Sequence, residues 1–364
     1  MTATPRAATH LPALDGLRAL AALWVVAFHA MHFTGAPTPI VRHGYLGVDL
    51  FFILSGFVLA HGYSEIFARD GLAFYSRYLV RRVARLWPVW LVVMTMFAIK
   101  PEIAHSLGLR GSGVRMAEEP GTWALYLLLM QSWGFTDPER INPPGWSLSY
   151  EWAASLVLPL ALMALVRLRS PLACLALAAL CLAAHALYTH AYALPTVNTG
   201  GAHGGARIAT GVLVGILLWR AWHHRRDDGA FDGMIAGACA LLGVGAMLLF
   251  LPALALDHVM VVLFVGLIGA VAGGRGWLAS VLQARPLRIL GEASYALYVV
   301  HWLVFEILGW IFGRLGGSIG SPLSWVFFGV MPVLSVVAAL ALHAVVERPS
   351  RRALRRLAEG APAR

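Results

Sequence analysis

The chain has 364 residues, of which 59% are hydrophobic and only 13% are charged, and its mean hydropathy is +0.72. Soluble domains are typically about 45–50% apolar and about 25% charged, so this composition excludes a soluble globular protein and predicts an integral membrane protein. The net charge of +10 comes with no basic stripe interleaved with aromatic residues, so we do not expect binding to nucleic acid.

Ten apolar segments follow one another along the chain, and a transmembrane helix needs about 20 such residues. They predict an all-α polytopic membrane protein with about ten transmembrane helices in one bundle. The expected spans are 14–34, 45–63, 79–100, 146–168, 171–190, 204–222, 233–251, 256–273, 290–312 and 323–347. A shorter apolar run at 122–135 predicts a re-entrant or interfacial helix inside the longest loop.

The distribution of basic residues predicts the orientation of these spans. With the N-terminus in the cytoplasm, the inner loops and helix ends hold 21 of the 28 Lys and Arg residues, as the positive-inside rule requires. Both termini are therefore expected in the cytoplasm, and the bilayer is expected to be the plasma membrane, which is the inner membrane of a bacterium. No cleavage pattern accompanies the first span, so we expect it to be retained.

Three parts of unequal size result from this topology. Residues 1–13 form a cytoplasmic segment, and residues 14–347 form the transmembrane domain. Residues 348–364 form a basic cytoplasmic tail that is suited to lie on anionic lipid.

The first span, "LDGLRALAALWVVAFHA", carries Arg18 and His29 among apolar residues. Ionisable side chains inside a membrane are costly and usually face a cavity. Eleven residues separate the two side chains by about 16 Å and return them to the same helix face. A membrane anchor would also explain Arg18, and a packing hydrogen bond would explain His29, but the shared face indicates a path between the two sides of the membrane.

Two carboxylates are expected at the depth of His29. Asp49 lies in the first turns of the second span, where helix capping is an alternative role, and Glu151 enters the fourth span from outside. A carboxylate inside a membrane needs a partner, and it raises the basicity of a neighbouring imidazole. The sequence therefore predicts that Glu151 or Asp49 pairs with His29.

The arginines Arg82 and Arg85 are three residues apart at the inner end of the third span. Two guanidiniums on one helix face can bind phosphates in a bidentate manner, although positive-inside charge is the simpler alternative. On the ninth span Tyr295, Tyr298 and His301 repeat the same spacing, which predicts a polar stripe that faces a cavity or another helix.

No metal site is predicted. The three cysteines, Cys174, Cys181 and Cys239, lie inside apolar runs without a C-x-x-C motif, which is typical of packing residues. The "HHRR" sequence at 223–226 has no further ligands nearby and is interpreted as loop charge.

Taken in order, these motifs resemble the acyltransferase 3 family of polytopic membrane enzymes. The matching pieces are "LDGLRALAALWVVAFH", "GYLGVDLFFILSGFVL", the Arg82–Arg85 pair followed by "LWP", "WSLSYEW", "LGEASYALYVVHW" and "VERP". The resemblance covers nearly the whole chain. Some members of the family add a C-terminal extracytoplasmic domain, and this sequence is expected to act without one.

The resemblance implies transfer of an acyl group, often acetyl, from cytoplasmic acyl-CoA to a hydroxyl of a carbohydrate. Acceptors in the family include surface polysaccharide, lipopolysaccharide and related glycolipids, and in some members small molecules. His29 matches the catalytic histidine of the family, with Glu151 or Asp49 as its partner, and acts either as a general base or through an acyl-histidine. Arg18, Arg82 and Arg85 match arginines associated with the donor, and the stripe of Tyr295, Tyr298 and His301 is expected to contribute to that site.

A proton-coupled transporter or flippase is the competing interpretation, because intramembrane Arg, His and Glu residues also build proton relays. A sensor or scaffold without chemistry is a third. The arginine pair and the lack of an evident inverted repeat favour the enzyme. The expected partners are acyl-CoA, a carbohydrate or glycolipid acceptor and membrane lipids, without a metal; the sequence specifies no oligomeric state.

Overall fold

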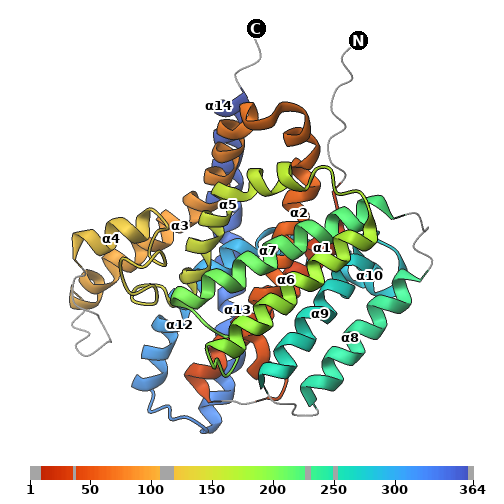
Figure 1. The fold of residues 1–364 in the computed structure, drawn as a ribbon. Coiled ribbons are helices and arrows are strands. Elements are labelled where there is room, and N and C mark those ends of the chain that lie inside the picture. Colours follow the sequence, from red (N-terminus) through yellow and green to blue (C-terminus); the bar gives the residue numbers. More distant parts are fainter. Residues whose placement is uncertain (1–9, 36–37, 107–118, 226–230, 249–252, 360–364) are drawn as a thin grey trace.

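The computed structural model (Figure 1) describes residues 10–35, 38–106, 119–225, 231–248 and 253–359, which form helices joined by short loops, with no strand in these ranges. The elements are α1 (Pro12–Thr34), η1 (Val41–Leu46), α2 (Gly47–Asp70), η2 (Gly71–Phe74), α3 (Tyr75–Ser106), α4 (Pro120–Leu127), η3 (Pro143–Gly145), α5 (Trp146–Leu165), α6 (Pro171–Ala191), α7 (Gly201–His224), α8 (Asp232–Leu248), α9 (Ala253–Val271), α10 (Gly276–Leu282), α11 (Arg285–Glu292), α12 (Ser294–Arg314), α13 (Pro322–Leu342), η4 (His343–Glu347) and α14 (Arg348–Glu359).

The apolar helices confirm the all-α polytopic class. Within the described residues, seven helical stretches are long and apolar enough to cross a membrane, and an eighth results if α9 and α10, which bend by 87°, count as one. One stretch, Val41–Ile103, includes both α2 and most of α3. Each of the ten expected ranges overlaps a helix, but the number of ten spans remains a prediction.

Close packing of α2 against α7 organises one side of the bundle, and α6 continues the layer on the other side of α7. Figure 1 shows α6, α7, α9 and α8 lying next to one another. A Cβ atom on Gly56 would lie 2.1 Å from the backbone oxygen of Val212, so only glycine permits this approach of α2 to α7. Small residues commonly allow such contacts between membrane helices.

The first helix lies against α2, α11, α12 and α13, so its polar residues face the interior of the bundle. Gly291 of α11 contacts the α1 backbone so closely that a Cβ atom there would lie 2.0 Å from the carbonyl oxygen of Asp15. The helix is interrupted immediately afterwards, at Ala293, which lies between α11 and α12. The prediction of one helix over 290–312 is therefore wrong at its start, because the contact with α1 fixes α11 as a separate helix.

Two further segments differ from the expected boundaries. In the run 122–135 only the part up to Leu127 is helical, since α4 is followed by turns. At the C-terminal end α13 stops at Leu342, a π-helical turn covers His343–Glu347, and α14 then packs against α3. The segment expected as a tail from residue 348 thus includes an ordered helix; residues 360–364 lie outside the described part.

Candidate functional site

A large central cavity of about 1480 Å³ runs along α2 and is bounded also by α1, α3, α5, α12 and α14. Its lining on α2 extends from Val48 near the start of the helix to Arg69 near its end, a distance of about 32 Å at 1.5 Å per residue. Typical small-molecule sites measure roughly 300–1,000 Å³, so this cavity suits an elongated ligand.

Positive charge dominates one half of the cavity. Among the described residues eight arginines and four carboxylates line it. The arginines are Arg18, Arg69, Arg81, Arg82, Arg85, Arg348, Arg351 and Arg355; the carboxylates are Asp15, Glu65, Glu151 and Glu292. We call the part that these arginines line the arginine half. Such an excess of guanidiniums with confined walls attracts anions.

Arg82 is held by α5. Its Nε donates a hydrogen bond to Ser155 Oγ (2.9 Å), and its Nη2 donates to Glu151 Oε1 (2.7 Å). Ser155 Oγ in turn donates to the backbone oxygen of Glu151 (2.7 Å). The predicted pairing of Glu151 with His29 is therefore wrong. The Arg82 guanidinium binds the Glu151 carboxylate instead, because it carries a full positive charge that a neutral imidazole does not.

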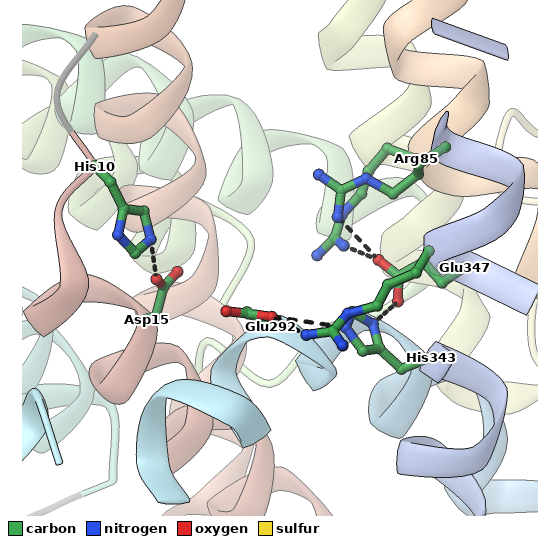
Figure 2. Close-up of polar contacts among 8 residues, drawn as sticks. His10, Asp15, Arg85, Glu292, His343 and Glu347 are labelled. Atoms are coloured by element: carbon green, nitrogen blue, oxygen red, sulfur yellow. Dashed lines mark hydrogen bonds and ion pairs between the residues drawn. The ribbon is translucent and has the colours of Figure 1, made fainter. Parts of the chain in front are cut away.

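Arg85 is held by a carboxylate that the sequence analysis did not select. Its Nη1 donates to Glu347, a fully buried residue that also accepts from His343 Nδ1 at 2.8 Å. The guanidinium lies over the ring of Tyr295, 5.2 Å from its centre. Figure 2 shows Arg85, Glu347 and His343 gathered on one side, the His10–Asp15 pair on the other, and Glu292 between them.

Arg18 differs from Arg82 and Arg85. It lines the cavity and is half-buried, and no residue of the described ranges accepts a hydrogen bond from its guanidinium. An arginine with five donors and no protein acceptor is available to an anionic ligand. Arg18 shares the lining of the central cavity with Arg82 and Arg85, so a ligand in the arginine half can reach its guanidinium.

At its other end two hydroxyl groups line the cavity, and we call this part the tyrosine end. Tyr298 and Ser147 line it, and their hydroxyl oxygens are 2.8 Å apart, so one hydroxyl donates to the other. Both oxygens also lie within hydrogen-bond distance of the backbone oxygen of Pro144, at 3.1 Å for Ser147 and 3.0 Å for Tyr298, and this carbonyl accepts. Phe51 of α2 packs against the Tyr298 ring. The tyrosine end thus combines an apolar wall with a pair of hydroxyl groups.

One helical step beyond Tyr298, His301 contacts His29. His301 is fully buried, and its Nδ1 lies 2.9 Å from the backbone oxygen of Tyr298, which can only accept. Nδ1 of His301 therefore carries the proton, and in the neutral ring Nε2 is an acceptor. This Nε2 lies 3.1 Å from His29 Nδ1, so His29 donates there and keeps an unprotonated Nε2. The contact with His301 thus fixes His29 in the tautomer that a general base requires.

His29 does not line the central cavity; His301 and Tyr298 lie between them. Its side chain is partly exposed on the other side, where the Trp302 ring stands edge-on to it at 5.5 Å. Trp302 Nε1 donates to Glu306 Oε1 (3.1 Å), and Glu306 also forms an ion pair with Lys100. These aromatic and charged groups therefore lie next to the imidazole on the side away from His301.

Asp49 lies away from this pair. It accepts two hydrogen bonds from Arg207 of α7, at 2.9 and 2.6 Å, and Arg207 also donates to the backbone oxygen of Tyr45 (2.8 Å). The predicted pairing of Asp49 with His29 is therefore also wrong. Asp49 and Arg207 instead line a separate cavity of about 220 Å³ between α2, α6, α7 and α9.

The sequence did not predict the ion pairs of three residues in these networks: Arg207, Glu347 and the α14 arginine Arg351. Arg207 lies inside an expected span, so the cost of an unpaired charge there was the available signal. Glu347 belongs to the "VERP" motif. Nothing local distinguished Arg351 from the other basic residues of its segment. Within the described residues, no group of three or more His, Cys, Asp or Glu side chains is arranged to hold a metal ion.

Comparison with known proteins gives one family over most of the chain. The sequence profile of the acyltransferase domain of the acyltransferase 3 family matches residues 11–342. No solved structure matches the chain.

Several curated relatives are similar to the chain. The peptidoglycan O-acetyltransferase OatA of Listeria monocytogenes is 25% identical over 82% of this chain and 50% of its own length. The putative peptidoglycan O-acetyltransferase YrhL of Bacillus subtilis is 25% identical over 94% of this chain and 55% of its own. The acyltransferase MdmB of Streptomyces mycarofaciens is 30% identical over 97% of this chain and 94% of its own length. The chain thus spans about half the length of the first two relatives and nearly all of the third.

Proposed function

Because the chain belongs to the acyltransferase 3 family, we propose that it is a membrane O-acyltransferase that moves an acyl group, expected to be acetyl, from acyl-CoA to a hydroxyl of a carbohydrate. The observation that carries this proposal is a series of contacts that joins the central cavity to His29. The arginine half of the central cavity leads to Tyr298, and the next helical steps lead to His301 and His29.

The donor proposal is supported by the shape and charge of the central cavity. Coenzyme A joins a phosphate-bearing nucleotide to a long neutral arm, and the cavity joins an arginine half to a part lined by apolar residues of α2 such as Phe52 and Leu59. Guanidiniums bind phosphates in a bidentate manner. In this proposal Arg18, Arg82 and Arg85 face the phosphates, Tyr295 supports Arg85, and the thioester is directed toward Tyr298.

The transfer step uses His29 as a general base. Its Nε2 takes the proton from the acceptor hydroxyl as the hydroxyl oxygen attacks the thioester carbonyl. The C–S bond then breaks, and the His29 imidazolium returns the proton to the sulfur, so that CoA leaves as the thiol and His29 is neutral again. His301 is a positioning residue that fixes the His29 tautomer. In this proposal the hydroxyls of Tyr298 and Ser147, which lie 2.8 Å apart, close the tyrosine end, and the acyl group reaches His29 when they separate.

The acceptor is proposed to approach from the exposed side of His29. Trp302 offers an apolar ring next to the imidazole, while Glu306 and Lys100 offer an acceptor and donors for hydroxyl groups. An aromatic face beside a few polar groups is suited to sugars, which are apolar on their ring faces and polar at their edges. The two peptidoglycan O-acetyltransferases among the relatives support a carbohydrate acceptor, such as a surface polysaccharide, lipopolysaccharide or glycolipid.

The orientation proposed for the membrane follows from the same path. The basic residues of the sequence predict that both termini face the cytoplasm, and the central cavity brings His10 and Asp15 near one terminus together with Arg351 near the other. The arginine half would then open to cytoplasmic acyl-CoA, and His29 would lie toward the outer side of the plasma membrane, the inner membrane in a bacterium.

The decisive experiment is a transfer assay with purified protein in nanodiscs, labelled acetyl-CoA, and a panel of peptidoglycan, lipopolysaccharide and small-molecule acceptors. Wild type is expected to release CoA and label a glycan, and His29→Ala is expected to lower kcat by about 10²–10⁴-fold, the usual contribution of a general base. A folded wild type that releases no CoA with any donor would favour the transporter interpretation. If only the small-molecule acceptors become labelled, the acceptor is a small molecule and the proposed glycan acceptor is wrong.

Direct transfer and a covalent acyl-histidine are separated by a second measurement. Protein mixed with labelled donor and no acceptor should carry no label after rapid denaturation, and initial rates should show a ternary complex. Label that remains on wild type and is absent from His29→Ala, together with ping-pong kinetics, would show the covalent route instead.

A further inference from the structure

We propose that the C-terminal helix α14 is part of the donor site, and that Arg351 and Arg355 bind the phosphate-bearing end of acyl-CoA. This inference rests on the donor proposed above, and it assigns a ligand-binding role to a segment that lies beyond the matched acyltransferase domain, which ends at residue 342. The basic composition of the segment alone would instead favour contact with anionic lipid.

The arginines of α14 are divided between two faces. Arg348, Arg351 and Arg355 line the central cavity, and their spacing of three and four residues places them on one face of the helix. Arg352 and Arg356 are exposed and are absent from the cavity lining. A helix that served only as a lipid anchor would have no reason to direct one row of guanidiniums into the interior cavity.

Glu347 fixes α14 next to the arginines of α3. Its buried carboxylate accepts from Arg85 of α3 and from His343, and Arg351 lies at 3.5 Å from Oε1. Arg351 therefore lies beside Arg85 across one carboxylate, and two guanidiniums exceed the charge that this carboxylate neutralises. The surplus charge faces the central cavity and is suited to a phosphate.

Arg355 lies one turn farther along the same face. It is exposed, it lines the central cavity, and in the part of the chain that the structure describes no side chain accepts a hydrogen bond from it. Arg348, in contrast, is bound to Glu292 of α11 at 2.6 Å. The helix is thus anchored by Arg348 and Arg351, whereas Arg355 remains available for a ligand.

The π-helical turn before α14 determines which row faces inward. Residues His343–Glu347 form this turn, and each extra residue in a helix rotates the following face by about 100°. π-turns of this kind occur frequently at functional sites. Here the turn directs the face of Arg351 and Arg355 to the central cavity and the face of Arg352 and Arg356 away from it.

The test compares two double variants that remove the same charge from the same helix, Arg351→Ala/Arg355→Ala and Arg352→Ala/Arg356→Ala. Donor kinetics are measured in nanodiscs with acetyl-CoA, 3′-dephospho-acetyl-CoA and S-acetyl-pantetheine, which carries no phosphate. The first pair should raise KM for acetyl-CoA about tenfold or more, as expected for lost charged hydrogen bonds, and leave KM for S-acetyl-pantetheine unchanged. The second pair should change neither value.

Three results would overturn the inference. Equal effects of both double variants, or effects that disappear in nanodiscs made only of zwitterionic lipid, would show lipid anchoring by α14. An unchanged KM for acetyl-CoA in Arg351→Ala/Arg355→Ala, with wild type active, would show that α14 does not contact the donor while the proposed function stands. If Arg351→Ala/Arg355→Ala is unstable, the KM of Arg355→Ala for acetyl-CoA decides between these outcomes, because in the described residues no side chain of another helix accepts a hydrogen bond from Arg355.

Binding is measured separately from transfer, so that failure of the proposed function can be recognised. Calorimetric titration of wild type with CoA should show binding that Arg351→Ala/Arg355→Ala weakens and Arg352→Ala/Arg356→Ala does not. Binding without any transfer by wild type would contradict the proposed function and support the role of α14. Wild type that transfers acetyl groups, with CoA binding insensitive to both variants, would give the opposite conclusion.

Discussion

The two ends of the central cavity arrange their polar groups in different ways. In the arginine half, eight guanidiniums come from α1, α2, α3 and α14, and only some of them are fixed by carboxylates. At the tyrosine end, the closing hydroxyls lead to His301 and His29 through contacts of 2.8–3.1 Å. The first arrangement spreads charge over many long side chains, and the second depends on single ring atoms of the buried His301 and the partly exposed His29.

This difference separates binding from chemistry. A ligand held by many charges loses a fraction of its affinity when one is removed, because the others remain and solvent screens each of them. A proton transfer that depends on one nitrogen loses most of its rate when that nitrogen turns or changes tautomer. Substitutions near His29 should therefore act strongly on kcat, and substitutions in the arginine half should act more weakly and on KM.

The largest effect after that of His29 itself is expected at His301. His301→Leu should lower kcat roughly tenfold to hundredfold, because His29 loses the acceptor that fixes its tautomer and its ring orientation. KM for the donor should change little, since His301 lies beyond the lining of the central cavity. Steady-state kinetics with varied acetyl-CoA would check this split between kcat and KM.

The matched variant is His301→Gln, whose amide oxygen can still accept from His29 Nδ1. It should recover a clear part of the lost kcat, and both variants should melt at similar temperatures. Equal activities of the Leu and Gln variants would mean that His301 only fills space, and the assigned tautomer would then carry no catalytic meaning.

A smaller effect, on the other half, is expected at Arg18. Arg18→Ala should raise the donor KM about fivefold to tenfold and leave kcat nearly unchanged, because this guanidinium has no protein acceptor in the described residues and is free for the donor phosphates. The donor KM of Arg18→Lys should lie between those of wild type and Arg18→Ala, since lysine keeps the charge without the bidentate geometry. Added salt should raise the KM of wild type more than that of Arg18→Ala.

Arg77→Ala is the control for net charge, because Arg77 is exposed on α3 and does not line the central cavity. Its donor KM should equal that of wild type. If Arg77→Ala and Arg18→Ala behaved alike, the arginine half would act only through its overall field, and Arg18 would have no particular contact with the donor.

The sequence predicts the helices well and their interruptions poorly. Length and apolar composition are local properties, so each expected span overlaps a helix. The break at Ala293 depends on Gly291 meeting Asp15 of α1, and the order of α14 depends on Glu347 meeting Arg85 of α3. Both contacts join segments far apart in the chain, and no periodicity within either segment contains them.

The candidate site shows the same division. Helical spacing selected Arg18, Arg82 and Arg85, which all line the central cavity, and the stripe of Tyr295 and Tyr298, which lines it too. The depth expected from the sequence did not identify the partner of His29, because Glu151 lies with Arg82 in the arginine half and not beside His29. Glu151 and Asp49 bind the arginines Arg82 and Arg207. The His29 imidazole contacts His301, which follows Tyr298 by three residues on the same face of α12.

The smallest expected effect tests the boundary between the two halves. Tyr298→Phe removes the hydroxyl that, with Ser147, closes the tyrosine end, and one hydrogen bond of this kind contributes about 0.5–1.5 kcal/mol. Because the closure weakens, hydrolysis of acetyl-CoA without acceptor should rise about threefold, while donor KM stays constant. Tyr295→Phe is the control, since its hydroxyl binds the Leu86 carbonyl and takes no part in the closure. Hydrolysis unchanged in Tyr298→Phe would mean that the acyl group reaches His29 without passing between Tyr298 and Ser147.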